Sequence, residues 1–344
     1  MTNKIGIGIT GSGFMGKTHA EAVLTLPQLQ LVAFSGGSRA PGLAQHYGVA
    51  YEPDADSLAR RSDIDAVIVT TPHHVHISET LAALEEGKHA LVEKPLATSV
   101  EDCDRMIEAA SSRALTLGVG YHQRFRNNNS EAYRLVREGA IGDILTIQVS
   151  MLSEGSLRDG GGWAWWDDPR SLGHILNSAP HGVDLLRWMM GSDVSSVSAL
   201  CRTFLSDVPV ENTTLAQMSF ENGALCSLFS TNVMADPGFV EETFRFRIIG
   251  SKGLMDLDPY GDLKIATDGS WQTVSTQPAA EYVAADVPIN PIRIAAYKSQ
   301  IQAFLDAIEG KPSALGSALD GRAGVEVCRA MLEASRGNTV VQLR

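Results

Sequence analysis

The sequence predicts an α/β protein of two domains, with a parallel sheet in the first and a mostly antiparallel open sheet in the second, α+β domain. Strand-like and helix-like segments alternate over the first 120 residues, which is typical of a parallel sheet covered by helices. The pattern changes after Tyr121, where longer alternating segments begin. A chain of 344 residues is long enough for two domains, which we place at residues 1–121 and 122–344.

The first half contains short apolar runs of the length that buried strands have. These runs are Ile5–Ile9, Leu29–Phe34, Ala66–Val69, Ala90–Val92 and Leu115–Gly118. Amphipathic segments separate them, at Thr18–Leu26, Ile77–Glu86 and Val100–Ala110, and are predicted to be helices. Strands and helices that alternate in this way place helices on both faces of the sheet.

The second half predicts an antiparallel sheet with helices on one face. Strands are expected at Ile144–Leu152, Val194–Phe204, Thr213–Phe220, Ala224–Ser230, Phe244–Ile249 and Leu254–Leu257. Asn222-Gly223, between the third and fourth of these, is a strong signal for a tight hairpin. Helices are expected at Asn127–Gly139, before Met190, at Pro291–Glu309 and at Gly321–Arg336, and a loop rich in glycine and tryptophan at Asp159–Ser171.

Composition excludes several classes of function. A formal net charge of −12 argues against a nucleic-acid partner or an anionic membrane surface. No stretch is apolar and long enough to span a bilayer, and the first residues do not resemble a signal peptide. Four scattered cysteines without a C-x-x-C pair indicate reduced thiols in a cytoplasmic protein. No cluster of histidine, cysteine and carboxylate has the spacing of a metal site, so we expect no metal.

A glycine-rich turn directly follows the first strand and opens the first helix. Residues 11–16 read Gly-Ser-Gly-Phe-Met-Gly, which is the pattern G-x-G-x-x-G. In this pattern the first glycine allows a tight turn, the second lets the backbone approach a pyrophosphate, and the third lets the helix pack closely on the strand. Free N–H groups at the helix N-terminus favour phosphate. The sequence therefore predicts a Rossmann domain that binds a dinucleotide through Gly11, Gly13, Phe14, Met15 and Gly16.

The end of the second strand bears on which dinucleotide binds. NAD sites usually carry an acidic residue about 20 residues past the glycines, for the ribose hydroxyls. Here Phe34 is followed by Ser-Gly-Gly-Ser-Arg, without a carboxylate. Ser35, Ser38 and Arg39 could instead take a 2′-phosphate, because a guanidinium is planar and permanently charged. We therefore expect NADP to be favoured. The alternative is a solvated loop that accepts NAD as well.

Further motifs resemble those of one family. Residues 71–76 have the form T-P-x-x-x-H, and residues 87–96 read Gly-Lys-His-Ala-Leu-Val-Glu-Lys-Pro-Leu. With the glycine turn, these are similar to the glucose–fructose oxidoreductase/inositol dehydrogenase (Gfo/Idh/MocA) family. The similarity continues through Tyr121–Phe125, Gly139–Gly142, His181–Asp184 and a C-terminal segment from Tyr297 to Pro312, and so covers nearly the whole chain.

The resemblance implies NAD(P)-dependent transfer of hydride between the cofactor and the alcohol or ketone carbon of a sugar, cyclitol or related polyol. It implies that these side chains border the cofactor: Thr71, Pro72, His73, His76, Glu93, Lys94, Gln123 and Arg124. Relatives often form dimers or tetramers through the C-terminal sheet, so a homodimer or homotetramer is expected.

Lys94 occupies the family position for proton transfer. When hydride leaves the alcohol carbon, a residue within hydrogen-bond reach must accept the hydroxyl proton. A partly desolvated lysine beside the nicotinamide has its pKa lowered toward neutrality and can carry that proton. Glu93 is expected to position the cofactor or Lys94. A cis peptide bond before Pro95, as in relatives, is also expected.

His181 is the second catalytic candidate. The family pattern is D-x-x-x-H with an aspartate three residues later, and this sequence has Asn177, His181 and Asp184. Because an amide cannot take a proton, we expect His181 to share the proton transfer, Asn177 to orient the substrate, and Asp184 to support the helix. Proline fits best in a first helical turn, so Pro180 predicts a helix that begins near Asn177 or Ser178.

Aromatic residues suggest further substrate contacts. Trp163, Trp165 and Trp166 precede an acidic pair, and an aromatic face suits the apolar side of a sugar or carbocycle, although such residues are as often packing residues. We expect Trp166 and Tyr297 to contact substrate, together with Lys94, Asn177 and His181.

Two other functions remain open from the sequence. A dehydrogenase of a cyclic cis-dihydrodiol would use the same hydride chemistry, and the tryptophan-rich loop would suit an aromatic-derived ring. A non-catalytic sensor would keep the fold and bind dinucleotide, and Asn177 in place of an aspartate leaves room for it. A fold alone does not distinguish these functions.

Overall fold

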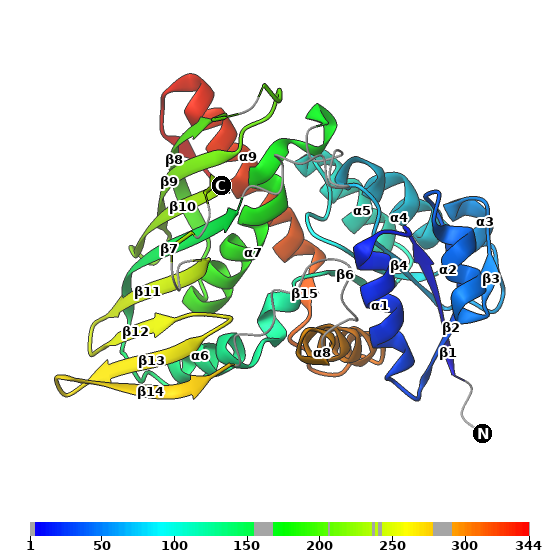
Figure 1. Ribbon diagram of the computed structural model, residues 1–344, viewed down its shortest axis with the longest axis horizontal. Helices are drawn as coiled ribbons and strands as arrows, with labels where there is room; N and C mark the ends of the chain where they lie inside the picture. Colours follow the sequence, from blue (N-terminus) through cyan, green and yellow to red (C-terminus); the bar gives the residue numbers. More distant parts are fainter. Residues whose placement is uncertain are drawn as a thin grey trace. The chain divides into compact units, whose positions relative to one another are not determined.

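Two compact units make up the chain (Figure 1). The computed structural model describes residues 4–154, 168–205, 207–235, 238–239, 243–277 and 291–343. Unit 1 comprises residues 1–125 and 281–322, and unit 2 comprises residues 126–280 and 323–344.

Unit 1 is built on a seven-stranded sheet in the order β15-β6-β5-β4-β1-β2-β3. The strands are β1 (Ile5–Thr10), β2 (Leu29–Ser35), β3 (Ala50–Tyr51), β4 (Ala66–Val69), β5 (His89–Val92), β6 (Leu117–Val119) and β15 (Gly316–Ser317). Neighbouring strands are parallel, except that β15 is antiparallel to β6. The parallel sheet predicted from the five apolar runs is confirmed. The two strands that the pattern missed, β3 and β15, have only two residues each.

Helices and turns connect these strands. They are α1 (Phe14–Leu24), α2 (Ala40–Tyr47), α3 (Ala55–Ala59), η1 (His73–Val75), α4 (His76–Glu85), α5 (Val100–Ser111) and η2 (His122–Phe125). Side chains cap two of the helices, because Asp54 accepts the N–H of Ser57 at the start of α3 (2.7 Å) and Ser99 accepts that of Asp102 at the start of α5 (3.1 Å).

The strand order of unit 1 reverses at the centre of the sheet. The chain passes from β1 to β2 and β3 on one side, and from β4 to β5 and β6 on the other. In open α/β sheets, ligands bind outside the carboxyl ends of the strands at such a switch point. The loops that leave this edge after β1, β4 and β5 contain Gly11–Gly16, Thr70–His76 and Glu93–Pro95.

The chain returns to unit 1 late in the sequence, which differs from the expected division at residues 121 and 122. Helix α8 (Pro291–Ile308) contributes Tyr297, Ile301 and Phe304 to the core that β1, β2 and α1 form. Burial of these apolar side chains, and not their position in the sequence, assigns α8 to this unit. The first crossing between units lies at Phe125.

Unit 2 is built on a nine-stranded sheet in the order β14-β13-β12-β11-β7-β10-β9-β8-β16. The strands are β7 (Ile144–Glu154), β8 (Val194–Arg202), β9 (Thr213–Phe220), β10 (Leu225–Met234), β11 (Phe244–Gly250), β12 (Leu254–Leu257), β13 (Asp262–Thr267), β14 (Ser270–Thr276) and β16 (Val341–Gln342). Among the strands of the described residues in this sheet, only β7 and β10 pair in parallel, so the predicted mostly antiparallel sheet is confirmed. Gly223 turns the β9–β10 hairpin with a φ of 86°.

Helices cover one face of this sheet. They are α6 (Asn127–Arg137), α7 (Gly173–Met190) and α9 (Ala318–Gly337, in unit 2 from residue 323 on). Figure 1 shows α6 and α7 along the same face of the sheet. Alternation along β9 reflects this, because Ala216, Met218 and Phe220 are buried in the core, whereas Leu215 and Gln217 are exposed. The opposite face carries no helix among the described residues.

The start of α7 corrects one expectation. The helix begins at Gly173, four residues before Asn177, and Pro180 lies inside it. A proline in a helix interior removes one backbone hydrogen bond. The helix tolerates this loss because Ile175, Leu176 and other residues of the same stripe are fully buried in the core of unit 2.

None of the helices in the described ranges has the length and apolar character needed to cross a bilayer.

Candidate active site

The glycine turn after β1 has the conformation that its pattern predicts. Gly11 has a φ of 95°, which favours glycine, and its N–H donates to the carbonyl of Ser35 (2.8 Å). A Cβ atom at Gly16 would lie 2.2 Å from the carbonyl oxygen of Gly11, so helix α1 can pack this closely only with glycine there.

Gly13 differs from the other two glycines because the space beside it is open. A Cβ atom at Gly13 would meet only Nη2 of Arg39, at 3.7 Å. Internal packing therefore does not require glycine at this position, whereas close approach of a pyrophosphate to the backbone does. The turn thus fits a dinucleotide, and the N–H groups at the start of α1 would hold its phosphates.

The residues at and just after the end of β2 separate into a buried and an exposed group. Ser35 is fully buried, whereas Ser38 and Arg39 are exposed. The guanidinium of Arg39 lies beside Gly13 and can contact a phosphate there. Of the three residues expected to take a 2′-phosphate, only Ser38 and Arg39 are therefore exposed.

His76 connects the loops after β4 and β5. Its Nδ1 lies 2.8 Å from the carbonyl oxygen of Pro95, and its Nε2 lies 2.8 Å from that of Thr71. Burial lowers the pKa of His76, although both backbone contacts oppose this shift. Thr71 in turn donates from its hydroxyl to the carboxyl of Glu79 (2.7 Å), whose pKa is raised by burial. The Thr71-Pro72 turn is therefore held from two sides.

Lys94 follows β5 and has the properties that proton transfer needs. The peptide bond between Lys94 and Pro95 is cis, as expected. The residue keeps some solvent exposure, but burial lowers the pKa of its ammonium to about 8, while the nearby Glu93 carboxylate acts in the opposite direction. At neutral pH both protonation states are therefore accessible.

A buried pair of Glu93 and His19 lies beside Lys94. Oε1 of Glu93 is 2.7 Å from Nε2 of His19, and Oε2 accepts the backbone N–H of Lys94 at 3.3 Å. Both side chains are almost fully buried. Gly120 leaves room for the carboxyl, since a Cβ atom there would come within about 3.0 Å of it. Glu93 therefore positions the backbone of Lys94 and is itself held by α1.

Tyr297 of α8 packs against the same histidine. Its ring stacks on His122 with centroids 4.6 Å apart and meets the edge of His19 at 5.3 Å. Its hydroxyl lies 4.0 Å from the sulfur of Met15 in the glycine turn. Tyr297 is 3% exposed, so within unit 1 it is a packing residue of the cofactor loop.

Three further candidates for cofactor binding in unit 1, His73, Gln123 and Arg124, are buried. Gln123 and Arg124 lie on η2, and Arg124 forms an ion pair with Asp320 at 3.1 Å. The His73 ring is buried 5.9 Å from that of His76. No cluster of three or more histidine, cysteine or carboxylate side chains in the described ranges could hold a metal ion.

Asn177 and His181 lie on one row of α7 in unit 2. The neighbouring row faces the sheet, because His174 Nε2 is 3.0 Å from Ser230 Oγ and a Cβ atom at Gly182 would lie 2.8 Å from the sulfur of Met151. Residues four apart share a helix face, so Asn177 and His181 form a row next to the one that contains His174 and Gly182. Both are partly exposed.

Glu211 holds the first turn of α7. Its carboxyl accepts the N–H of Ile175 and the hydroxyl of Thr214 (3.2 Å), and its backbone carbonyl accepts the N–H of His174 (3.2 Å). Two of the N–H groups that a helix start leaves unpaired are thus satisfied by one residue. Burial raises the pKa of Glu211 to about 7.

Three expected residues lie outside the described part of the chain, and three residues of the site were not expected from the sequence. Trp163, Trp165 and Trp166 fall outside the described residues. Sequence patterns did not indicate His19, Glu79 or Glu211, because their partners are distant in sequence or have no motif. The histidine four residues after the motif's Met15 is the one local signal that could have drawn attention to α1.

Models of known protein families match both halves of the chain. The model of an oxidoreductase family with an NAD-binding Rossmann fold matches residues 5–121, and the model of the GFO/IDH/MocA C-terminal domain matches residues 130–256. The chain belongs to the Gfo/Idh/MocA family. It is an oxidoreductase with a Rossmann domain for NAD(P), as the resemblance of its motifs implied.

Several known dehydrogenases and reductases resemble the chain over most of its length. Inositol 2-dehydrogenase 3 of Saccharopolyspora erythraea is 26% identical over 97% of this chain and 94% of its own. The 1,5-anhydro-D-fructose reductase of Ensifer adhaerens is 29% identical over 76% of this chain and 75% of its own. The structure of a levoglucosan dehydrogenase in complex with NADH has a TM-score of 0.86, at 24% identity and 99% and 100% coverage.

Proposed function

We propose that this oxidoreductase transfers hydride between a nicotinamide dinucleotide and a secondary alcohol or ketone of a sugar, cyclitol or related polyol. One observation carries the proposal. Lys94, with a pKa of about 8, follows β5 at the edge where the glycine turn fits a dinucleotide. The names of the relatives, which act on inositol, anhydrofructose and levoglucosan, support the substrate class.

Lys94 carries the proton in this proposal. When bound, the nicotinamide supplies or takes the hydride. In alcohol oxidation the neutral amine of Lys94 accepts the hydroxyl proton, and in carbonyl reduction its ammonium donates one. Glu93 and His19 hold the backbone of Lys94, so they act through its position and not through contact with substrate.

In this proposal His181 and Asn177 assist Lys94 in proton transfer and substrate orientation. Imidazole titrates near neutral pH, so His181 shares the proton transfer, while the amide of Asn177 orients the substrate hydroxyl. The resemblance to the family motif around His181 supports these roles.

The same proposal favours NADP over NAD. No carboxylate follows Phe34 to bind the ribose hydroxyls, and exposed Ser38 and Arg39 offer a hydroxyl and a guanidinium to a 2′-phosphate. The position of Arg39 beside Gly13 supports a phosphate contact.

A substrate panel tests the function. We expect reduced-nicotinamide absorbance to change when the protein is mixed with cofactor and one of myo-inositol, levoglucosan or 1,5-anhydro-D-fructose. A cis-dihydrodiol of benzene in the same panel tests the alternative dehydrogenase. Dinucleotide binding without turnover of any member would instead support a sensor and refute the proposed activity.

A cofactor comparison tests the NADP preference. Arg39→Ala should weaken NADP binding about ten- to a hundredfold, because a charge-assisted contact is worth about 1.5–3 kcal/mol. NAD binding should change little, which provides the internal control. A clear preference of the unaltered protein for NAD, or unchanged NADP affinity in the variant, would refute it.

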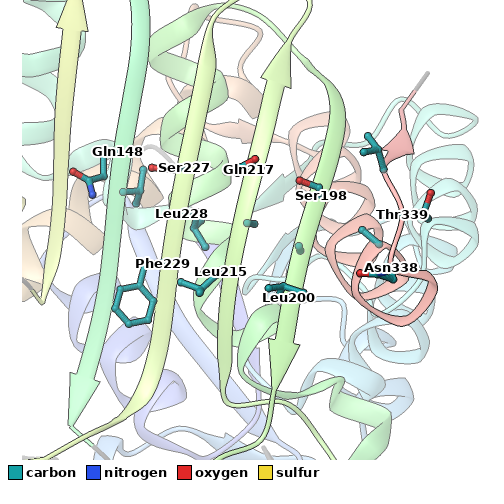
Figure 2. Close-up of a pocket in the computed structure, with 15 residues that line it drawn as sticks. Gln148, Ser198, Leu200, Leu215, Gln217, Ser227, Leu228, Phe229, Asn338 and Thr339 are labelled. Carbon is teal, nitrogen blue, oxygen red and sulfur yellow. The ribbon is translucent and has the colours of Figure 1, made fainter.

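We also propose that the open face of the unit 2 sheet joins two copies of the chain. This face carries a hollow of about 720 Å³. Figure 2 shows the residues that line it, and its labelled residues come from β7, β8, β9, β10 and the segment after α9. Leu200, Leu215 and Phe229 form one cross-strand row here and are exposed by 50%, 50% and 38%. Exposed apolar residues in a continuous patch mark an interaction surface.

A further inference from the structure

Asn232, near the end of β10, has a buried side-chain amide that the fold does not satisfy. The residue is 2% exposed, and neither Nδ2 nor Oδ1 has a hydrogen-bond partner in the part of the chain that the structure describes. Its backbone is nevertheless fixed, because its N–H donates to the carbonyl of Asn212 at 3.1 Å. Leaving a buried amide unsatisfied costs stability, so its presence requires a reason.

A β-bulge surrounds this residue. The pairing of β10 with β7 joins Thr231 to Leu152 and next joins Met234 to Glu154, so β10 contains one more residue than β7 in this interval. Asn232 lies in the bulge. Bulges are enriched next to active sites, where they redirect a side chain. The bulge is thus a second observation that points to a ligand near Asn232.

The direction of β10 places Asn232 near the start of α7. Leu228 lies against Gly182 of α7, and two residues later Ser230 contacts His174 in the first turn of the helix. The strand and the helix therefore run in opposite directions. Two more residues along the strand, about 6–7 Å, bring the chain to Asn232 at the N-terminal end of α7. This is the helix that carries Asn177.

We propose that the amide of Asn232 binds a hydroxyl group of the polyol substrate. This inference rests on the proposed function. An amide offers one acceptor and two donors, so Oδ1 can accept the proton of one hydroxyl while Nδ2 donates to a neighbouring one. A ring without hydroxyls at that position would leave the amide unsatisfied, so Asn232 selects hydroxylated rings.

The test combines stability with substrate affinity. Asn232→Leu keeps the branched shape and removes the polar atoms. We expect the melting temperature of the ligand-free protein to rise, by about 2–6 °C, because an unsatisfied amide is removed. With NADPH present, addition of myo-inositol or levoglucosan at a fixed concentration should shift the melting temperature less than it does in the unaltered protein. KM for the better of the two should rise about three- to tenfold. Asn232→Ala, which cannot clash with its neighbours, should show the same loss of affinity.

Asn128 of α6 is the matched control. It is equally buried in unit 2, but Nδ2 donates to the carbonyls of Asp258 and Gly261 (both 2.9 Å) and Oδ1 accepts from Ser275 (2.7 Å). Asn128→Leu should therefore lower the melting temperature.

A lower melting temperature in Asn232→Leu, or KM unchanged within twofold in both Asn232 variants, would overturn the inference. Failure of the proposed function is seen separately, as the absence of turnover by the unaltered protein with every polyol, and the inference would fall with it.

Discussion

Two influences act on the pKa of Lys94 in opposite directions. Burial lowers it and the Glu93 carboxylate raises it, and together they leave it at about 8. Alcohol oxidation needs the neutral amine, so kcat/KM for oxidation should rise as the pH increases through about 8. Carbonyl reduction needs the ammonium and should decline over the same range. Initial rates in both directions between pH 6 and about 9.5 measure this.

Lys94→Ala should remove this pH dependence and lower turnover about 10²- to 10⁴-fold, as is typical of a lost acid–base group. Cofactor affinity should persist, because the glycine turn is unchanged, and fluorescence titration with NADPH provides that control. Turnover close to normal in this variant would exclude Lys94 from the mechanism.

His181 and Asn177 differ in what their side chains can do with a proton. His181→Ala should therefore depress kcat and flatten the pH profile near neutrality. Asn177→Ala should mainly raise KM, as expected for lost ground-state binding. Steady-state kinetics of both variants check the division of roles. It would be wrong if Asn177→Ala abolished turnover and His181→Ala did not.

Residue-scale inference from sequence worked where the partners are close in the chain. Gly11, Gly13 and Gly16 form one contiguous pattern, and the φ of Gly11 and the close approach at Gly16 agree with it. The contact of His19 with Glu93 joins residues 74 positions apart, and no local pattern encodes it. Ser35 fits a phosphate site by type, but its place at the end of β2, between β1 and β3, buries it.

At the scale of elements, Glu211 stabilises the start of α7 through its hydrogen bonds. Its folded-state pKa is raised from 4.5 to about 7, so the folded protein retains this proton to a higher pH than the unfolded chain does. The stability that this group contributes is therefore complete below about pH 4.5 and is lost as the pH rises to about 7. Glu211→Gln keeps an acceptor for Ile175 and cannot titrate. Its advantage in melting temperature over the unaltered protein should grow across this range.

Melting curves by circular dichroism at several pH values test this prediction. Glu211→Ala, which removes the cap and cannot titrate either, should cost about 0.5–2 kcal/mol below about pH 4.5. This cost relative to the unaltered protein should decline as the pH rises to about 7. Parallel melting temperatures of Glu211→Gln and the unaltered protein over the whole range would show that Glu211 does not titrate there.

The elements also show why periodicity predicts some boundaries and not others. Hydrophobic alternation located β9 and β10 because one face of each is buried. It missed β14, where nearly every residue is exposed and no alternation remains. It misplaced the start of α7, because Pro180 suggests a first turn while burial of Ile175 and Leu176 extends the helix past it. Burial in the core of unit 2 determined where α7 begins, and a rule that considers only neighbouring residues does not include such burial.

At the scale of the whole molecule, the order of the segments along the chain does not decide which unit each segment joins. The alternation of strands and helices predicted both sheets, yet α8 joins unit 1 after the chain has passed through unit 2. Amphipathic character showed only that α8 is a helix. Which core it enters depends on complementarity with α1 and β2, which lie more than 250 residues earlier.

The open sheet face leads to the last prediction, which concerns assembly. Leu225, Ile249 and Leu254 are exposed by 53%, 49% and 38% and form a second cross-strand neighbourhood beside the row of Leu215 and Phe229. An apolar sheet face of this kind is stabilised by covering it, and an identical face on a second copy covers both at once. We therefore expect a homodimer or homotetramer in solution.

Phe229→Lys would place an unpaired ammonium in that interface, at a cost of about 3–5 kcal/mol per buried charge. Light scattering during size-exclusion chromatography should show smaller particles for this variant. Leu24→Lys is the control, because Leu24 is also exposed (57%) but lies at the end of α1 in unit 1, and it should leave the mass unchanged. A monomeric unaltered protein, or a Phe229→Lys variant with unaltered mass, would mean that this face serves another purpose.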